Sequence, residues 1–142
     1  MVRDVLIVDD SATIRQMVKK TMAMAGLDVG DVYEASNGIE ALAQLNDHPV
    51  AAMLVDINMP TMNGIQLLTR MKQNEQLKDI PIVIVSTEGS KQRIQEIEDF
   101  GAFGFIRKPF QPEMLRDVLQ PILGVKDDDA GTEDGNADDD LF

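Results

Sequence analysis

Two kinds of apolar pattern alternate along the chain. Short runs of branched apolar residues predict buried strands at 5–8, 32–35, 51–55, 81–85 and 103–107. Longer stretches, in which apolar residues recur every three or four positions, predict amphipathic helices at 12–25, 38–46, 64–73, 90–100 and 111–123. Because strands and helices alternate throughout, we expect an α/β fold with one doubly wound, five-stranded parallel sheet and helices on both faces.

Local signals mark several ends of these elements. Gly26 follows the last apolar position of the first helix and predicts its end. Ser90 is a suitable N-cap for the fourth helix, and Pro112 suits the first turn of the last helix. Asn63-Gly64 indicates a turn followed by the start of the third helix.

The 142-residue chain carries a net charge of −12, and its acidic residues gather at one end. Residues 126–142 hold eight acidic side chains and one basic one, mixed with Gly, Asn and Ala. Such a segment cannot bury enough apolar surface to offset its ordering entropy. We therefore expect a folded domain at 1–125 and a disordered acidic tail at 126–142. The tail is either a solubilising end or, through its final Leu141-Phe142, a short docking peptide.

Composition excludes several classes of function. The chain has no cysteine and a single histidine, His48, so disulfides, cysteine-bound metals and multi-histidine zinc sites are excluded. No basic patch suits a nucleic acid backbone, and no apolar run approaches the roughly 20 residues that span a membrane. The N-terminus lacks the plan of a signal peptide. We expect a cytoplasmic monomer that binds neither nucleic acid nor membranes.

Polar residues stand at the ends of four of the five predicted strands. These residues are Asp9, Asp10, Asp56, Ser86, Thr87 and Lys108. The carboxyl ends of parallel strands meet at one edge of the sheet, where doubly wound folds bind their ligands. Three clustered carboxylates repel one another unless a cation intervenes, and Mg²⁺ prefers oxygen ligands. The lysine adds a positive charge suited to an incoming anion.

Each of these residues has a simpler explanation when it is taken alone. Asp9 and Asp10 suit helix caps, Asp56 suits a turn, and Lys108 suits a solvated surface. The combination is more informative, because four separate parts of the chain each supply a residue type that a site for a metal ion and an anion requires.

Four motifs resemble the receiver domain of two-component response regulators, over residues 3–124. They are Asp9-Asp10, Asp56-x-Asn58-x-Pro60-x-x-x-Gly64, Ser86-Thr87 and Lys108-Pro109-Phe110. The single-domain chemotaxis regulators are the members that the chain resembles most. The resemblance implies the flavodoxin-like receiver fold and a signalling protein that catalyses only its own phosphorylation and dephosphorylation.

The resemblance also implies an aspartyl phosphate at Asp56, with a histidine kinase as the phosphoryl donor. It implies that Mg²⁺ binds to Asp10, Asp56 and the backbone carbonyl of Asn58. Asp9 would either be a further ligand or hold a water molecule bound to the metal. Lys108 and Ser86 would contact the phosphoryl oxygens. Phosphoryl transfer depends on positioning and charge neutralisation, which such side chains can supply.

The resemblance also implies that further residues control the response to phosphorylation. Ser86 and Phe105 would form the switch that reports phosphorylation, and Phe105 stands where the chemotaxis regulators have tyrosine. Asn58, Thr87 and Glu88 would set the lifetime of the phosphoryl group. Thr87 departs from the Ala or Gly that the family favours, so its bulk is expected to slow dephosphorylation.

The partners are inferred from the same resemblance. We expect output through phosphorylation-dependent binding to a protein target, such as the flagellar motor switch, with a phosphatase as a further partner. The alternative is a phosphorelay intermediate or phosphate sink in a pathway other than chemotaxis.

Other protein classes share parts of the pattern. Haloacid dehalogenase-type phosphatases also form an aspartyl phosphate, but they carry an acid two residues later, where this chain has Asn58. Flavodoxins bind phosphate in a loop rich in Ser, Thr and Gly, whereas Asp9-Asp10 would repel a phosphate. A non-signalling scaffold of the same fold would not require the acidic cluster.

Overall fold

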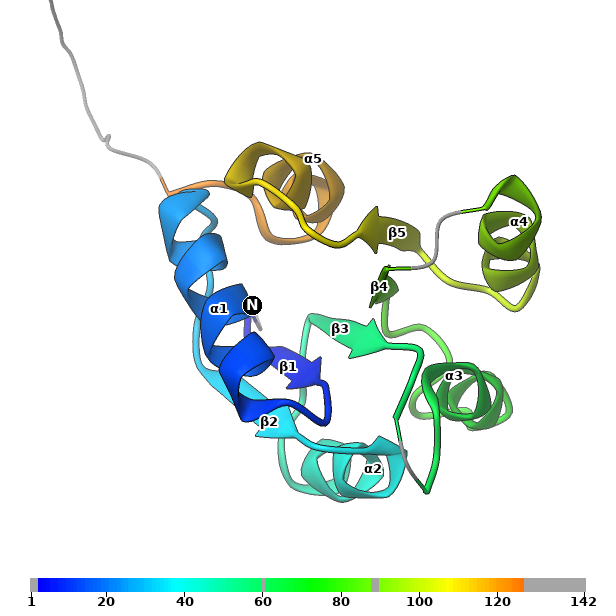
Figure 1. The fold of residues 1–142 in the computed structure, drawn as a ribbon. Coiled ribbons are helices and arrows are strands. Elements are labelled where there is room, and N and C mark those ends of the chain that lie inside the picture. Colours follow the sequence, from blue (N-terminus) through cyan, green and yellow to red (C-terminus); the bar gives the residue numbers. More distant parts are fainter. Residues whose placement is uncertain (1–2, 60, 88–89, 127–142) are drawn as a thin grey trace, which may run out of the picture.

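The structure, a computed structural model, describes residues 3–59, 61–87 and 90–126. Strands and helices alternate in the order β1 (Val5–Val8), α1 (Ala12–Met24), β2 (Val32–Ala35), α2 (Gly38–Asp47), β3 (Ala52–Asp56), α3 (Gly64–Lys72), β4 (Ile82–Ser86), α4 (Lys91–Asp99), β5 (Gly104–Arg107) and α5 (Pro112–Leu123). The strands form one parallel sheet in the order β2-β1-β3-β4-β5 (Figure 1). The predicted doubly wound, five-stranded fold is therefore confirmed.

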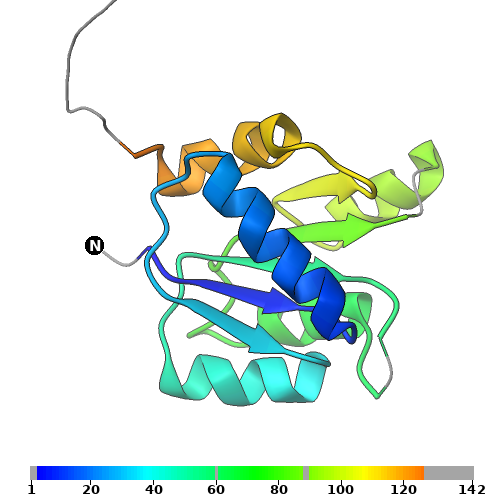
Figure 2. The same ribbon diagram turned by 60° about the vertical axis from the view of Figure 1, so that its left-hand side comes forward.

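Helices cover both faces of the sheet. Helices α1 and α5 lie on one face, and α2, α3 and α4 lie on the other (Figure 1 and Figure 2). Residues of one strand alternate between the faces: Val5 and Ile7 pack with α1 and α5, while Leu6 and Val8 pack with the other three helices. Because both faces are covered, the central strands are buried along their length, which explains their continuous apolar runs in the sequence.

The ends of the elements agree with the predicted ends to within one residue. The Ser90 hydroxyl caps α4 by accepting from the N–H of Arg93 over 3.1 Å, as predicted. Gly26 follows α1 with a φ of 73°, a left-handed conformation that favours glycine. Strands β3 and β4 each extend one residue beyond the predicted range, so Asp56 and Ser86 are their last residues rather than loop residues.

The chain returns to α1 after α5. Val125 forms an isolated antiparallel bridge with Leu27, and the Lys126 N–H donates to the Gly26 carbonyl over 2.8 Å. Residues 127–142, which make up the rest of the predicted acidic tail, lie outside the described residues. Across the described part of the chain, no helix is long and apolar enough to cross a membrane.

Candidate metal and phosphoryl site

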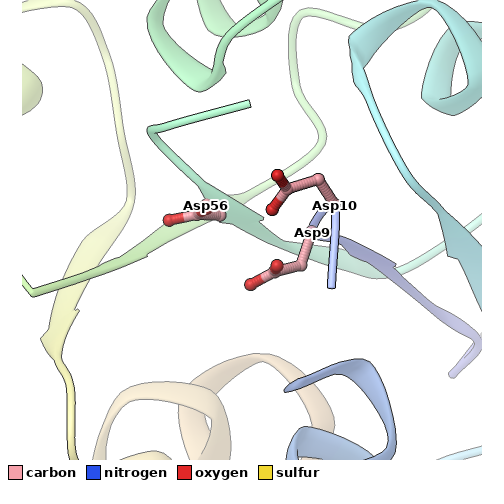
Figure 3. Close-up of side chains that lie close together, drawn as sticks. All are labelled: Asp9, Asp10 and Asp56. Carbon is pink, nitrogen blue, oxygen red and sulfur yellow. The ribbon is translucent and has the colours of Figure 1, made fainter. Parts of the chain in front are cut away.

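Three carboxylates gather at the carboxyl edge of the sheet. From β1 the chain crosses to β2 on one side, and it then returns to β3 on the other side of β1. The ends of β1 and β3 therefore lie side by side at the point where the direction of winding reverses. Asp9 and Asp10 follow β1 and Asp56 ends β3, and one oxygen of each lies within 4.8 Å of the others (Figure 3).

Asp9 is held by contacts on several of its atoms. Its Oδ1 accepts from the Ser11 N–H over 2.9 Å, and its Oδ2 accepts from the Lys108 Nζ over 3.1 Å. Its own N–H donates to the Ala35 carbonyl at the end of β2. The side chain is buried, whereas Asp10 is exposed. Asp9 is thus fixed within the fold, and Asp10 faces solvent at its edge.

The helix-cap explanation for the two acids is wrong in this structure. Ser11 is the N-cap of α1, and its Oγ accepts from the Ile14 N–H over 3.2 Å. Asp9 binds the Ser11 N–H, which precedes the helix. The carboxylates of Asp9 and Asp10 are therefore placed beside Asp56 without serving as the cap.

Lys108 reaches the cluster from the end of β5. Its Nζ lies 3.1 Å from Asp9 Oδ2 and 3.7 Å from Asp56 Oδ1. Its N–H donates to the Ser86 carbonyl over 2.8 Å, and the peptide bond to Pro109 is cis. The lysine side chain is only 18% exposed. The ammonium group therefore compensates two of the carboxylates inside the site instead of standing as a solvated surface charge.

The carboxyl of Asp56 has a raised pKa. Burial is the main cause, because it disfavours the ionised form, and the neighbouring charges of Asp9 and Asp10 act in the same direction. Lys108 and the backbone N–H of Asn58 oppose the shift but do not cancel it. Three carboxylates share the single positive charge of Lys108, so the cluster is short of positive charge, which a cation would supply.

The other predicted site residues that the structure describes differ in burial and lie on or just beyond strands β3, β4 and β5. Ser86 is fully buried at the end of β4, while Thr87 and Asn58 are exposed in the loops beyond β4 and β3. Phe105 lies in β5 and packs against the core on the face of α2, α3 and α4. Glu88 lies outside the described residues.

Gly64, which the sequence places at a helix start and in the Asp56 motif, also supports the site through its backbone. Its N–H donates to the Ile57 carbonyl over 2.9 Å, and the start of α3 approaches the backbone of Asp56 closely. A Cβ on residue 64 would lie 2.5 Å from the Asp56 carbonyl oxygen. Glycine is needed here because two backbone segments meet, not because of a special φ.

The donor set suits a small, hard cation. Three carboxylates supply oxygen ligands, one of them open to solvent, and no sulfur or imidazole nitrogen is among them. Mg²⁺ binds through one or two carboxylates together with waters and the oxygens of a phosphoryl group. The residues present therefore fit such an ion.

A doubly wound sheet with three acids and one lysine at its switch point is typical of the receiver domains of signalling proteins. This chain belongs to the response regulator receiver domain family, whose model matches residues 5–120. Chemotaxis protein CheY1 of Helicobacter pylori is 37% identical over 123 residues, which are 86% of this chain and 98% of that protein. A CheY homolog of Campylobacter jejuni is 38% identical over 84% of this chain and 92% of its own length.

A solved structure agrees with these relatives. The chemotaxis response regulator CheY4 of Vibrio cholerae is 39% identical, with a TM-score of 0.75, over 87% of this chain and all of that chain. The similarity to chemotaxis response regulators therefore extends over nearly the whole of the described domain. The predicted membership of the receiver family is confirmed.

Proposed function

We propose that this chain is a single-domain response regulator that accepts a phosphoryl group on Asp56 and signals by binding a protein. One observation carries the proposal: the ammonium of Lys108 lies between the carboxylates of Asp9 and Asp56, within 3.1 Å and 3.7 Å of them. The site thus combines a nucleophile, a cation for an incoming anion and oxygen ligands for a metal.

The transfer is a substitution at phosphorus. An Asp56 carboxylate oxygen attacks the phosphorus of a kinase phosphohistidine, forming a P–O bond as the P–N bond breaks. The imidazole nitrogen keeps the electron pair of the broken bond and takes up a proton. Lys108 offsets negative charge on the phosphoryl oxygens, and the hydroxyl of Ser86, the last residue of β4, is proposed to bind one of them.

The metal of the proposed reaction is Mg²⁺. Its protein ligands are Asp9, Asp10, Asp56 and the backbone carbonyl of Asn58. When bound, Mg²⁺ neutralises charge on the attacking carboxylate and on the phosphoryl oxygens. The acidic cluster supports this assignment, because its carboxylates are close enough to share one ion.

Phosphorylation is expected to change the surface around β4 and β5. Ser86 ends β4 at the site, and Phe105 lies on the adjacent strand, paired with Ile84. A phosphoryl group that draws the Ser86 hydroxyl would be sensed by this pair of strands. Asn58, Thr87 and Glu88 are proposed to govern its lifetime.

The output is proposed to be chemotaxis in the cytoplasm, through a target such as the flagellar motor switch. The similarity to chemotaxis proteins over almost their entire lengths supports this choice. The alternative, a relay intermediate or phosphate sink, predicts transfer of the phosphoryl group to or from a second protein without a motor partner.

The first experiment is phosphorylation with acetyl phosphate, followed by intact-mass spectrometry. Wild-type protein should gain one phosphoryl group when Mg²⁺ is present, and chelation of the metal should prevent the gain. Asp56→Asn should remain unmodified, while Asp47→Asn, which removes an exposed carboxylate at the end of α2, should react as wild type. Equal modification of Asp56→Asn would refute the assignment of the phosphoacceptor.

A second experiment addresses the output. Beryllium fluoride with Mg²⁺ mimics the phosphoryl group, and a motor-switch protein should be retained by wild type only in its presence, with Asp56→Ala as the control. Retention of the motor-switch protein without the mimic, or no retention with it, would contradict the proposed output.

Steady turnover of a phosphomonoester would instead favour the phosphatase class.

A further inference from the structure

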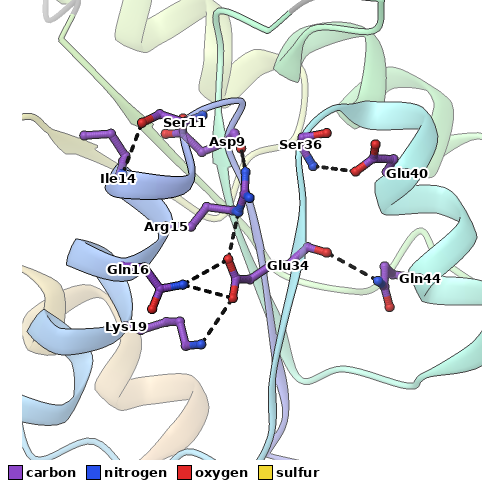
Figure 4. A network of polar contacts seen from close by, with 10 residues as sticks. All are labelled: Asp9, Ser11, Ile14, Arg15, Gln16, Lys19, Glu34, Ser36, Glu40 and Gln44. Atoms are coloured by element: carbon purple, nitrogen blue, oxygen red, sulfur yellow. Dashed lines mark hydrogen bonds and ion pairs between the residues drawn. The ribbon is translucent and has the colours of Figure 1, made fainter.

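Arg15 joins the acidic loop after β1 to the neighbouring strand β2 (Figure 4). Its Nη1 donates to the backbone carbonyl of Asp9 over 2.6 Å, and its Nε donates to Glu34 Oε1 over 2.8 Å. The arginine side chain is only 16% exposed. One guanidinium group thus connects the backbone of the acidic loop to a side chain on β2.

The position of Arg15 in α1 explains this reach. Side chains of a helix point toward its N-terminus, and residue 15 lies one turn after the Ser11 cap. A long side chain from this position extends back over the first turn toward the Asp9 carbonyl. That carbonyl belongs to a buried residue, and a buried carbonyl requires a donor.

Glu34 holds the guanidinium in place. Its carboxylate accepts from Arg15, from the Lys19 Nζ over 3.1 Å and from the Gln16 Nε2 over 3.3 Å (Figure 4). The hydrogen bond from Arg15 is the main reason that the pKa of Glu34 is lowered, so the carboxylate is ionised at neutral pH. The positive charge of Arg15 is therefore partly offset by Glu34, which also pairs with Lys19.

We propose that Arg15 is a positioning residue of the metal site, which fixes the backbone of Asp9 so that the Asp9 and Asp10 side chains face Asp56. The inference rests on the proposed function, because it concerns a site that binds Mg²⁺. Arg15 touches no carboxylate oxygen of the cluster, and its contact is with the backbone behind the cluster.

Loss of Arg15 has two opposing consequences for Mg²⁺ binding. Removing a positive charge near a cation site favours the cation, whereas releasing the acidic loop disfavours it. The charge effect is small, because Arg15 contacts the Asp9 backbone rather than a carboxylate of the cluster, and Glu34 offsets part of its charge. The positioning effect is larger, since partners that orient metal ligands typically change affinity by about 10–100-fold. Mg²⁺ affinity should therefore fall although a positive charge is lost.

The test compares Arg15→Met with Lys19→Met in the 142-residue chain. Both changes remove one positive charge and one ion pair to Glu34 from the same helix, but only Arg15 contacts Asp9. Methionine keeps much of the apolar stem of each side chain. MgCl2 titration is followed through the amide chemical shifts of residues 9–12 and 56–58, and circular dichroism checks the fold.

Arg15→Met should weaken Mg²⁺ binding by about tenfold or more, while Lys19→Met should stay within roughly twofold of wild type, as expected for a partly exposed ion pair. Arg15→Lys keeps the charge but lacks the two-pronged donor group, so it should also weaken binding. Unchanged or tighter binding in Arg15→Met or Arg15→Lys, or equal weakening in Lys19→Met, would overturn the proposal. Failure of wild type to bind Mg²⁺ would instead contradict the proposed function.

Discussion

Gly64 is where helix α3 meets the end of β3, and we predict that Gly64→Ala both destabilises the domain and displaces Asp56. A Cβ at this position would lie 2.5 Å from the Asp56 carbonyl oxygen and 2.9 Å from the Ile57 Cα. Both atoms belong to the backbone, so no side chain can rotate away to relieve the contact. The start of α3 and the end of β3 must move apart.

The expected magnitude follows from two opposing terms. Overpacking costs about 1–3 kcal/mol, and backbone contacts this short place Gly64→Ala at the upper end of that range. Replacing glycine by alanine within a helix stabilises the helix by at most about 1 kcal/mol, which opposes this cost. The free energy of unfolding should therefore fall by about 2 kcal/mol, which corresponds to roughly 6–10 °C in Tm for a domain of this size.

The assay is urea unfolding followed by far-ultraviolet circular dichroism, because the chain has no tryptophan for fluorescence. Gly26→Ala is the control, since Gly26 has a φ of 73°. Among the residues that the structure describes, apart from Gly26 and its two chain neighbours, none has an atom within 4 Å of the position that a Cβ would take there. That change should cost about 1–2 kcal/mol through backbone strain alone. Both variants should be less stable, and only Gly64→Ala should also weaken Mg²⁺ binding.

Two results would refute this reasoning. A Gly64→Ala protein within about 0.5 kcal/mol of wild type would show that the backbone accommodates the methyl group. A destabilised Gly64→Ala protein with wild-type Mg²⁺ affinity would show that Asp56 does not move with Gly64.

Other variants test the charges of the site. Lys108→Met should raise Mg²⁺ affinity by about tenfold, because it removes a cation that neighbours two ligand carboxylates; calorimetric titration measures this, and weaker binding would contradict it. Asp56→Asn should stabilise the metal-free protein near neutral pH. Because the pKa of Asp56 is raised in the folded protein, the folded state binds the Asp56 proton more tightly than the unfolded state does. The free energy of unfolding of wild type, relative to that of Asp56→Asn, therefore declines as pH rises from the ordinary pKa of 3.8 through the folded-state pKa. Urea unfolding across this range checks the sign, and parallel pH curves for the two proteins would exclude it. Thr87→Ala should speed loss of the phosphoryl group after the donor is removed, whereas an unchanged or slower decay would end the idea that its bulk protects the group.

The fold and the location of the acids could be predicted because each depends on local pattern. Strands buried on both faces must be apolar along their length, and the first polar residue then marks the carboxyl end of each strand. Asp9 and Asp56 were recognisable in this way, although the sequence placed Asp56 one residue beyond its strand. A one-residue error arises because a polar side chain at a strand end looks the same as the first residue of a loop.

The contacts that support the site could not be predicted in the same way. Arg15 follows an ordinary helical pattern, and nothing nearby in the sequence indicates that its partner is the Asp9 carbonyl or that Glu34 fixes it from another strand. Gly64 likewise resembles a helix start, because its contact with Asp56 depends on how α3 packs against β3. Such contacts depend on the tertiary arrangement, and the residue type at one position does not reveal which distant backbone atoms it meets.

Two cations contact Asp9, and they differ in which of its atoms they hold. Lys108 binds the carboxylate Oδ2, an atom that a metal would also bind, so it competes with Mg²⁺. Arg15 binds the backbone carbonyl, leaves both carboxylate oxygens available, and has part of its charge offset by Glu34. Equal losses of positive charge at these two positions should therefore change Mg²⁺ affinity in opposite directions. Net charge alone would predict the same direction for both, so the pair of variants separates electrostatic competition from positioning at a single residue.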